Sequence, residues 1–216
     1  MRAVRDAVDE GEIDVAVPER VVVFGRGRGV FESPVALRLG VEPEVIARRV
    51  GGVVAGGFVR VVLTVGEILE AVLRDPRYGV ARVPGGVWDE WPRTFENPGF
   101  SVRYAYARAC WVGRWARELG IGDGPLGAGS LESELVWALG DVPGRAEQAE
   151  RERDARPLML CLEKVAGAYH DVHERCPAVP KGDEEPVPGR VGLARAVEVV
   201  LGNGLNVIGE IPRERI

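Results

Sequence analysis

Apolar positions recur at two different spacings along the chain, and the pattern changes near its middle. In the first part, short runs of apolar and β-branched residues, typical of strands, alternate with segments whose apolar residues recur every three to four positions. The strands are predicted at Val21–Phe24 and Phe58–Leu63, and the helices at Val35–Leu39, Pro43–Val50 and Val65–Leu73. This alternation predicts a small α+β module.

The second part shows only the helical spacing. Its predicted helices are Val102–Leu119, Leu131–Leu139, Leu158–His173 and Val191–Ile208. Ser130 is placed to cap the helix that begins at Leu131, and Gly140 to end it. The charged and proline-rich segment from Lys181 to Pro188 is expected to be an exposed loop. Four or five packed helices are the natural architecture for such a segment.

A Pro/Gly-rich stretch with two tryptophans, Pro84 to Pro92, separates the part with mixed spacing from the part with helical spacing alone. We interpret this stretch as a linker. We therefore expect an α+β module over residues 1–80, a linker over 81–96 and a helical domain over 97–216. The predicted fold class is α+β, in which a small N-terminal α+β domain is followed by an all-α helical bundle.

Composition limits the cellular setting. Apolar residues make up 46% of the 216 positions and charged residues 28%, as in ordinary globular proteins. No apolar run is long enough for a membrane helix, and the acidic start of the chain lacks the apolar core of a signal peptide. The three cysteines (Cys110, Cys161 and Cys176) are odd in number and far apart, which favours a reducing compartment. We expect a cytoplasmic protein with no membrane partner.

The overall charge gives no general attraction to nucleic acid. The chain has 28 basic and 33 acidic residues, a net charge of −5, so any RNA binding must come from a local patch. One candidate is the glycine-rich segment from Gly25 to Gly29, where Arg26 and Arg28 lie close to Phe31. This segment lacks the Gly-Lys-Ser/Thr ending of a phosphate loop, so it is either an RNA-contacting loop or a plain turn.

His170, His173 and Cys176 follow one another at intervals of three residues on a predicted helix, a spacing possible for zinc ligands. No fourth ligand is grouped near them, and the small residues around Gly167 favour close helix packing instead. No nucleophile motif accompanies the two histidines. We therefore predict no metal site, no catalytic residue and no cofactor.

The run from Asn97 to Arg114 is the most informative. Asn97 followed by Pro98 is typical of a helix start, and residues 97–120 carry four arginines and one glutamate. Arg103, Arg114 and Arg117, with Tyr106, would place guanidinium groups and an aromatic ring on the helix surface. Such a face suits phosphate binding. It is equally typical of a solvated face on a packed helix, and spacing alone leaves both open.

The same run resembles the opening of the DALR anticodon-binding domain of arginyl-tRNA synthetases, which reads Asn-Pro-Val-Tyr-Tyr-Val-Gln-Tyr-Ala-His-Ala-Arg. The matching positions are Asn97, Pro98, Val102, Tyr104, Ala105, Ala107 and Arg108, whereas Arg103 replaces Gln and Tyr106 replaces His. Residues 165–176 resemble the family's Leu-Ala-x-Ala-Phe-x-x-Phe-Tyr-x-x-Cys helix, residues 193–209 its last helix, and residues 212–216 its Pro-Glu-Arg-Met terminus.

The first part resembles the family's N-terminal additional domain. The positions that follow its order are Gly29, Phe31, Ser33, Ala36, Leu37 and Leu39, then Ile46 and Ala47, then residues 54–59 and the helix that ends at Leu73. Val30 and Pro34 replace a polar Asp and Asn of the family pattern. In the family this domain contacts the tRNA elbow, so the loss of two polar groups bears on that contact.

The resemblance implies tRNA as partner. The phosphates would be bound by Arg103, Arg108, Arg114 and Arg195, with a structural role as the alternative for Arg108. An anticodon base would stack on Tyr106 or Trp111. The family's catalytic domain would have to fit between Leu73 and Asn97, and its His-x-Gly-His and Lys-Met-Ser-Lys-like signatures have no counterpart here. The chain is expected to be noncatalytic. The alternatives are a protein-interaction module that docks on a synthetase or tRNA-using enzyme, and a subunit that complements a separate catalytic domain.

Overall fold

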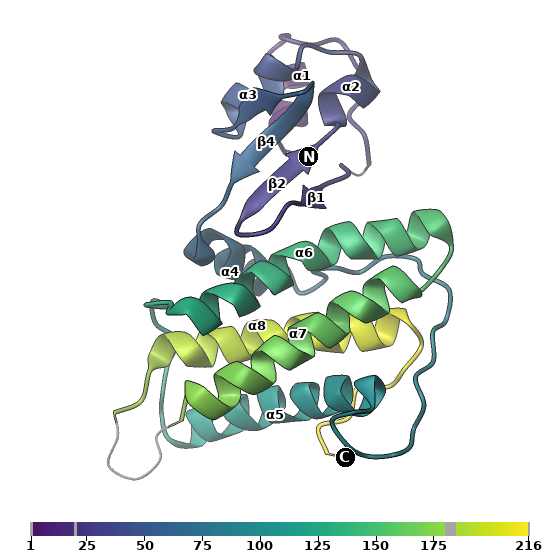
Figure 1. Cartoon of the computed structure of the whole chain (residues 1–216). Helices are drawn as coiled ribbons and strands as arrows, with labels where there is room; N and C mark the ends of the chain where they lie inside the picture. Colours follow the sequence, from purple (N-terminus) through teal and green to yellow (C-terminus); the bar gives the residue numbers. More distant parts are fainter. Residues whose placement is uncertain (1, 20, 180–184, 216) are drawn as a thin grey trace. The chain divides into compact units, whose positions relative to one another are not determined.

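The computed structural model describes residues 2–19, 21–179 and 185–215. Contacts between residues divide it into two units, Met1–Thr64 and Val65–Ile216, which we describe separately. Figure 1 shows an antiparallel sheet with short helices in the first unit and long helices in the second. The predicted fold class, a small α+β part followed by a helical bundle, is therefore confirmed.

The first unit is built on a four-stranded sheet of order β1-β2-β4-β3, in which every neighbouring pair is antiparallel. Ala55 pairs with Phe58, so β3 and β4 are joined by Gly56 and Gly57 alone. Both glycines have positive φ (58° and 80°), which a two-residue turn of this kind requires. The elements are α1 (Arg2–Asp9), β1 (Phe24–Gly25), β2 (Val30–Ser33), α2 (Val35–Leu39), α3 (Pro43–Arg49), β3 (Val53–Ala55) and β4 (Phe58–Val62).

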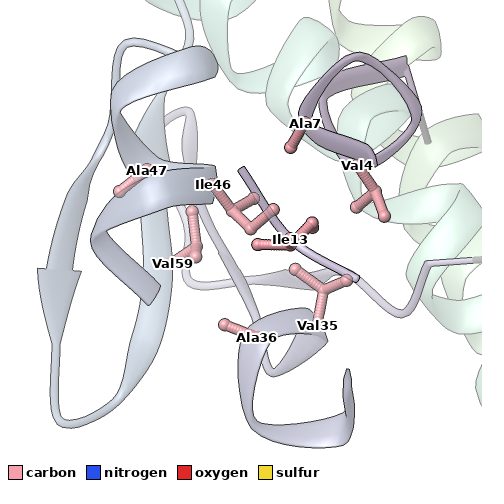
Figure 2. Packing of buried hydrophobic residues seen from close by; sticks show 8 residues of the cluster. All are labelled: Val4, Ala7, Ile13, Val35, Ala36, Ile46, Ala47 and Val59. Carbon is pink, nitrogen blue, oxygen red and sulfur yellow. The ribbon is translucent and has the colours of Figure 1, made fainter. Parts of the chain in front are cut away.

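A small apolar core holds these elements together. Ile13, which lies outside any helix or strand, points toward Ile46 of α3 and Val35 of α2 (Figure 2). Val4 and Ala7 of α1 and the other buried residues of the cluster complete it. The helices therefore pack on the sheet through aliphatic side chains with no aromatic contribution to the buried cluster.

The strand expected at Val21–Phe24 is largely wrong, because only Phe24 belongs to β1. Val22 is buried, and its carbonyl accepts a hydrogen bond of 2.6 Å from the Ser33 Oγ of β2. The apolar character of this run therefore accompanies burial of Val22 and not strand pairing. The helix α1 (Arg2–Asp9) and the strand β2 (Val30–Ser33) had not been expected from the spacing.

The second unit consists of α4 (Val65–Arg74), α5 (Pro98–Glu118), α6 (Ser130–Glu152), α7 (Arg156–Arg175) and α8 (Pro188–Val207). Figure 1 shows the four long helices α5 to α8 packed beside one another, and contacts join α6 to α7 and α5 to both α7 and α8. Among the helices described, none combines the length and the apolar character needed to cross a membrane.

Helix α6 corrects two expectations. Gly140 does not end it; the helix continues through Pro143 to Glu152, because buried apolar positions recur at helical spacing on both sides of the proline. Packing of that face therefore outweighs the backbone hydrogen bond that the proline cannot make. Ser130 is not the cap either: Gly129 occupies the cap position and makes no side-chain hydrogen bond, while Ser130 is the first helical residue.

Helix α4 belongs to the second unit, whereas the sequence had assigned it to the first module. Ile68, Leu69 and Val72 are buried, and α4 packs against α6 and α8. The division between units accordingly falls after Thr64 and not in the stretch 81–96. Of the expected loop from Lys181 to Pro188, residues 181–184 lie outside the described residues, and Pro188 begins α8.

The segment between α4 and α5 is extended and attached to the bundle. Trp88 is buried, and its indole Nε1 donates a hydrogen bond of 2.7 Å to Glu163 Oε1 of α7. The Gly86 amide donates to the Ile208 carbonyl (2.9 Å) at the end of α8. The Pro84–Pro92 stretch therefore acts as part of the second unit's surface and positions the start of α5.

Candidate nucleic-acid interface

Helix α5 begins where the sequence expected, and one side chain defines its start. The Asn97 Oδ1 accepts hydrogen bonds from the Gly99 and Phe100 amides, at 2.9 and 3.3 Å. Its Nδ2 donates to the carbonyls of Asp89 (2.9 Å) and Pro92 (3.0 Å) in the preceding segment. Asn97 thus caps the helix and ties it to the segment before it.

An aromatic cluster surrounds the first turns of α5. Phe100 stacks on Tyr104 with ring centroids 5.5 Å apart, and Phe95 and His170 of α7 contact Tyr104 at 5.6 and 5.9 Å. The His170 Nε2 lies 3.0 Å from the Ser101 carbonyl. Burial lowers the pKa of His170 below its ordinary value of 6.5, and the charge of Arg108 acts in the same direction. His170 is therefore a neutral packing residue.

Arg108 is held by this cluster. Its guanidinium carbon lies 4.4 Å from the Tyr104 ring centroid, and its Nη1 is 3.3 Å from the His170 Nδ1 and 3.5 Å from the Glu174 Oε1. The side chain is mostly buried. These contacts favour the structural role over phosphate binding for Arg108.

Three other arginines predicted to bind phosphate are paired with carboxylates. Arg103 makes two parallel hydrogen bonds to Glu210, from Nε (2.7 Å) and Nη2 (2.8 Å), and this interaction raises the pKa of Arg103. Arg114 pairs with Glu214, and Arg195 of α8 pairs with Asp123 in the segment between α5 and α6. In this state a phosphate would have to compete with each carboxylate for its guanidinium.

Tyr106 does not face solvent in a way that suits stacking. Its ring lies against α8, where a Cβ built on Gly202 would be 3.1 Å from the Tyr106 Cε2. Burial, followed by a hydrogen bond with Cys110, raises the pKa of the Tyr106 hydroxyl. Tyr106 is thus a contact between α5 and α8.

Trp111 is half-exposed and has a partner that the sequence did not single out. Trp111 and Trp115 are 37% and 44% exposed, and their rings meet edge to face with centroids 5.5 Å apart. Arg114 lies over Trp111 at 5.4 Å. Tyr104, Arg108, Trp111 and Trp115 follow at intervals of four, three and four residues, so they share one face of α5.

These side chains line a groove of about 540 Å³ that also includes His173 of α7 and Glu214 and Arg215 of the chain end. Flat aromatic rings beside guanidinium groups form a surface on which an unpaired base can stack while its phosphate is neutralised. Trp115 and Glu214 had not been identified from the sequence. The spacing of four residues between Trp111 and Trp115 could have indicated that Trp115 shares this face of the helix. Nothing in the local sequence indicates that Glu214 lies at the groove.

The glycine-rich loop of the first unit is a tight turn. Gly27, Arg28 and Gly29 have positive φ, and the Arg26 amide bonds to the Val30 carbonyl across the turn. The Arg26 Nε donates to Glu32 Oε2 at 2.6 Å, while Arg28 is exposed and Phe31 is part of β2. These three residues belong to a different unit from α5.

The possible zinc ligands are used otherwise. His170 belongs to the aromatic cluster, and the His173 ring contacts Tyr169 at 5.9 Å between centroids. Within the described parts of the chain, no group of three or more His, Cys, Asp or Glu side chains could hold a metal ion.

Comparison with known sequences identifies the helical part. The profile of the DALR anticodon binding domain matches residues 102–216, which include most of α5, all of α6 to α8 and the chain end. The chain belongs to the DALR anticodon-binding domain family. In this DALR-family chain the matched region begins within α5, so neither the Asn97 cap nor the first unit is part of it.

Two curated relatives of the DALR-family chain are arginine–tRNA ligases. The ligase of Clavibacter sepedonicus is 37% identical over 131 residues, which cover 57% of this chain and 24% of the ligase. The ligase of Frankia alni is 36% identical over 133 residues, with the same two coverages. The chain is thus related to arginyl-tRNA synthetases but spans only about a quarter of the length of these relatives.

Proposed function

We propose that this chain binds tRNA through the exposed face of α5 and does not itself aminoacylate. The observation that carries the proposal is the groove on a DALR-family helix, where Tyr104, Trp111 and Trp115 lie beside Arg108 and Arg215. The rings supply stacking surfaces for unpaired anticodon bases, and the exposed guanidinium group of Arg215 offsets phosphate charge. Because the relatives carry the name arginine–tRNA ligase, an arginine acceptor is the proposed tRNA class.

The noncatalytic part of the proposal rests on the interior of the chain. Between Arg74 at the end of α4 and Pro98 at the start of α5, the chain forms no helix or strand. No histidine precedes His170, and Lys164 and Lys181 are the two lysines in the sequence. ATP-dependent activation depends on positioned cationic and imidazole groups that stabilise charge on the reacting phosphate, and the segment between α4 and α5 contains no histidine and no lysine.

A second function is favoured by one observation. Arg103, Arg114 and Arg195 are already paired with carboxylates, and residues 97–216 carry 15 basic and 18 acidic side chains. A DALR scaffold with such a neutralised surface would serve as a docking module for a synthetase or for another tRNA-using enzyme. The half-exposed pair Trp111 and Trp115 would then contact a protein and not a base.

The two functions are separated by titration of the purified protein with bulk tRNA across a salt series. A tRNA binder loses affinity as salt rises, with a log–log slope set by the number of phosphates neutralised. Replacing both indole rings (Trp111→Ala and Trp115→Ala) is expected to weaken binding by about 1–3 kcal/mol for each base that stacks. Leu160→Ala, which removes an exposed apolar side chain from α7, is the control and should leave the affinity unchanged.

Absence of tRNA binding at the lowest salt would reject the RNA function in favour of docking on a protein. Binding that responds to salt but not to loss of the two rings would keep tRNA as the ligand and move its contact away from the groove. Charging of tRNA with arginine by the purified chain alone would contradict the noncatalytic proposal.

A further inference from the structure

A cavity of about 590 Å³ lies at the start of α5, beside the groove already described. Its walls are the extended segment before α5, the first turns of α5 and the chain end from Gly209 to Arg215. The charged residues that line it are Arg93, Arg103, Arg213, Arg215, Glu90 and Glu210. Four guanidinium groups thus face two carboxylates, an excess of positive charge within a chain whose net charge is −5.

Two other cavities of the second unit have balanced charges. The cavity between α6 and α7 is lined by three basic and three acidic side chains (Arg145, Arg156, Lys164, Asp141, Glu152 and Asp154). The cavity at the start of α7 has two of each sign. The groove on α5 has two arginines against one glutamate, and it shares Arg215 with the cavity at the helix start. The positive potential is therefore concentrated in two adjoining hollows along α5.

The arginines of this cavity differ in how far they are already engaged. Arg103 is bound by both oxygens of Glu210, and Arg93 makes a longer contact of 3.3 Å with Glu90 between exposed side chains. Arg213 and Arg215 are exposed, and neither side chain has an ion pair or hydrogen bond within the residues that the structure describes. They are the guanidinium groups that a new anion can reach without displacing a carboxylate.

The chain end is fastened so that these two arginines are held at the cavity. Glu210 binds Arg103 near the start of α5, and Glu214 binds Arg114 eleven residues further along the same helix. At 1.5 Å per residue these anchor points are about 16 Å apart, so the short segment between the glutamates must be extended along α5. Glu210 and Glu214 neutralise arginines of α5, whereas Arg213 and Arg215 beside them add positive charge to the cavity.

The uncharged walls suit a base or ribose. Trp88 is buried with its indole nitrogen bonded to Glu163, so its remaining surface toward the cavity is apolar. Phe100 lines the same cavity and is stacked on Tyr104, which lines the neighbouring groove. Aromatic walls beside unpaired guanidinium groups match a nucleotide, because the ring contacts the base or sugar while the fork-shaped cation binds phosphate.

We propose that this cavity is a nucleotide-phosphate site, in which Arg213 and Arg215 of the chain end, with Arg93, contact the backbone of an RNA that occupies the α5 groove. The inference rests on the proposed tRNA binding and adds phosphate-binding residues to it. It also replaces Arg103 and Arg114 in that role, since both serve to fasten the chain end.

The test compares two double variants of the full chain. Arg213→Gln with Arg215→Gln removes the two free guanidinium groups, whereas Arg77→Gln with Arg82→Gln removes the same charge from exposed positions that line none of the cavities described. Thermal unfolding of each variant checks that the fold is retained. Binding of bulk tRNA is measured over a salt series, and binding of uridine monophosphate is measured at low salt.

For tRNA, the Arg213 and Arg215 variant should bind about tenfold more weakly, and its log–log salt slope should be shallower by about 2, while the control stays close to the wild type. Binding of the mononucleotide should weaken in the same variant only. If the two variants bind tRNA equally well, the cavity is not a phosphate site, although tRNA binding itself stands.

The remaining outcomes separate the inference from the function on which it rests. A wild-type chain that fails to bind tRNA but binds the mononucleotide through Arg213 and Arg215 would reject the proposed function and leave a site for free nucleotides. A wild-type chain that binds neither would reject both.

Discussion

At the scale of single residues, Asn97 does more than a helix cap usually does. Its side-chain oxygen accepts hydrogen bonds from two backbone amides of α5, and its side-chain nitrogen donates to two carbonyls of the preceding segment. The residue is buried, so any of these groups left unpaired would also be out of reach of bulk water. One side chain therefore sets both the start of α5 and the path of the chain that forms a wall of the proposed nucleotide site.

We expect Asn97→Ala to lower the free energy of unfolding by about 2–3 kcal/mol, of which about 1 comes from the cap and the rest from the two carbonyls that lose a donor. Urea unfolding followed by circular dichroism measures the change. Ser130→Ala is the matched control, because Ser130 stands at the start of α6 but does not provide its cap. Its effect should stay within about 0.5 kcal/mol. Equal losses in the two variants would contradict the role given to Asn97.

At the scale of elements, the fit between α5 and the segment before it depends on a missing side chain. A Cβ on Gly99 would lie 2.3 Å from the Trp88 Cβ, closer than two carbon atoms can approach. By contrast, a Cβ on Gly167, on the exposed side of α7, meets nothing within 4 Å. The two glycines look alike in sequence, and their opposite surroundings follow only from packing.

Gly99→Ala should therefore destabilise the protein by about 1–3 kcal/mol, the usual result of overpacking. Gly167→Ala should stabilise it by about 0.5–1 kcal/mol, because alanine is the better helix former and no clash offsets that gain. Thermal unfolding of both variants under one set of conditions measures the pair. A destabilised Gly167 variant, or a Gly99 variant equal to the wild type, would show that the packing described here is wrong.

The elements also show what the sequence could and could not predict. The helices Val35–Leu39 and Val65–Leu73 and the start of α5 at Asn97 were predicted because apolar spacing and the Asn-Pro pair act locally. The length of α6 was not predicted, because packing on both sides of Pro143 outweighs the helix-breaking effect of that proline. The pairing of Arg103 with Glu210 and of Arg114 with Glu214 joins residues about a hundred positions apart, and no spacing rule connects them. Hence arginines that suited phosphate by sequence proved to hold the chain end.

At the scale of the whole molecule, the two units carry different kinds of titrating group. In the first unit, hydrogen bonds from Arg60 and Arg26 lower the pKa of Glu32, and Arg49 lowers the pKa of Glu10, each from an ordinary value of 4.5. In the second unit, burial lowers the pKa of His170 from 6.5 and raises the pKa of Glu198 from 4.5. The units should therefore respond to acid in different pH ranges.

The direction in which each group changes stability with pH depends on whether the folded or the unfolded state binds the proton more tightly. Below pH 6.5 the unfolded chain protonates His170 more readily than the folded chain, so the second unit loses stability as pH falls from that value. Glu198 acts in the opposite sense, because its folded form takes up a proton first and so offsets part of the loss. In the first unit, Glu32 and Glu10 stabilise the fold above pH 4.5. This stabilisation is lost as pH falls through and below 4.5, because the unfolded carboxylates bind protons more readily than the folded ones.

We therefore expect amide protection factors from hydrogen exchange to fall first in α5 and α7 and only at lower pH in β2 and β4. Glu32→Gln should flatten the acid response of the first unit alone, and His170→Gln should flatten the response of the second unit as pH falls below 6.5. Because the two substitutions lie in different units, their effects should add without coupling. A single acid transition shared by both sets of amides, and shifted equally by either substitution, would mean that the units unfold as one body and that neither side chain controls its own unit.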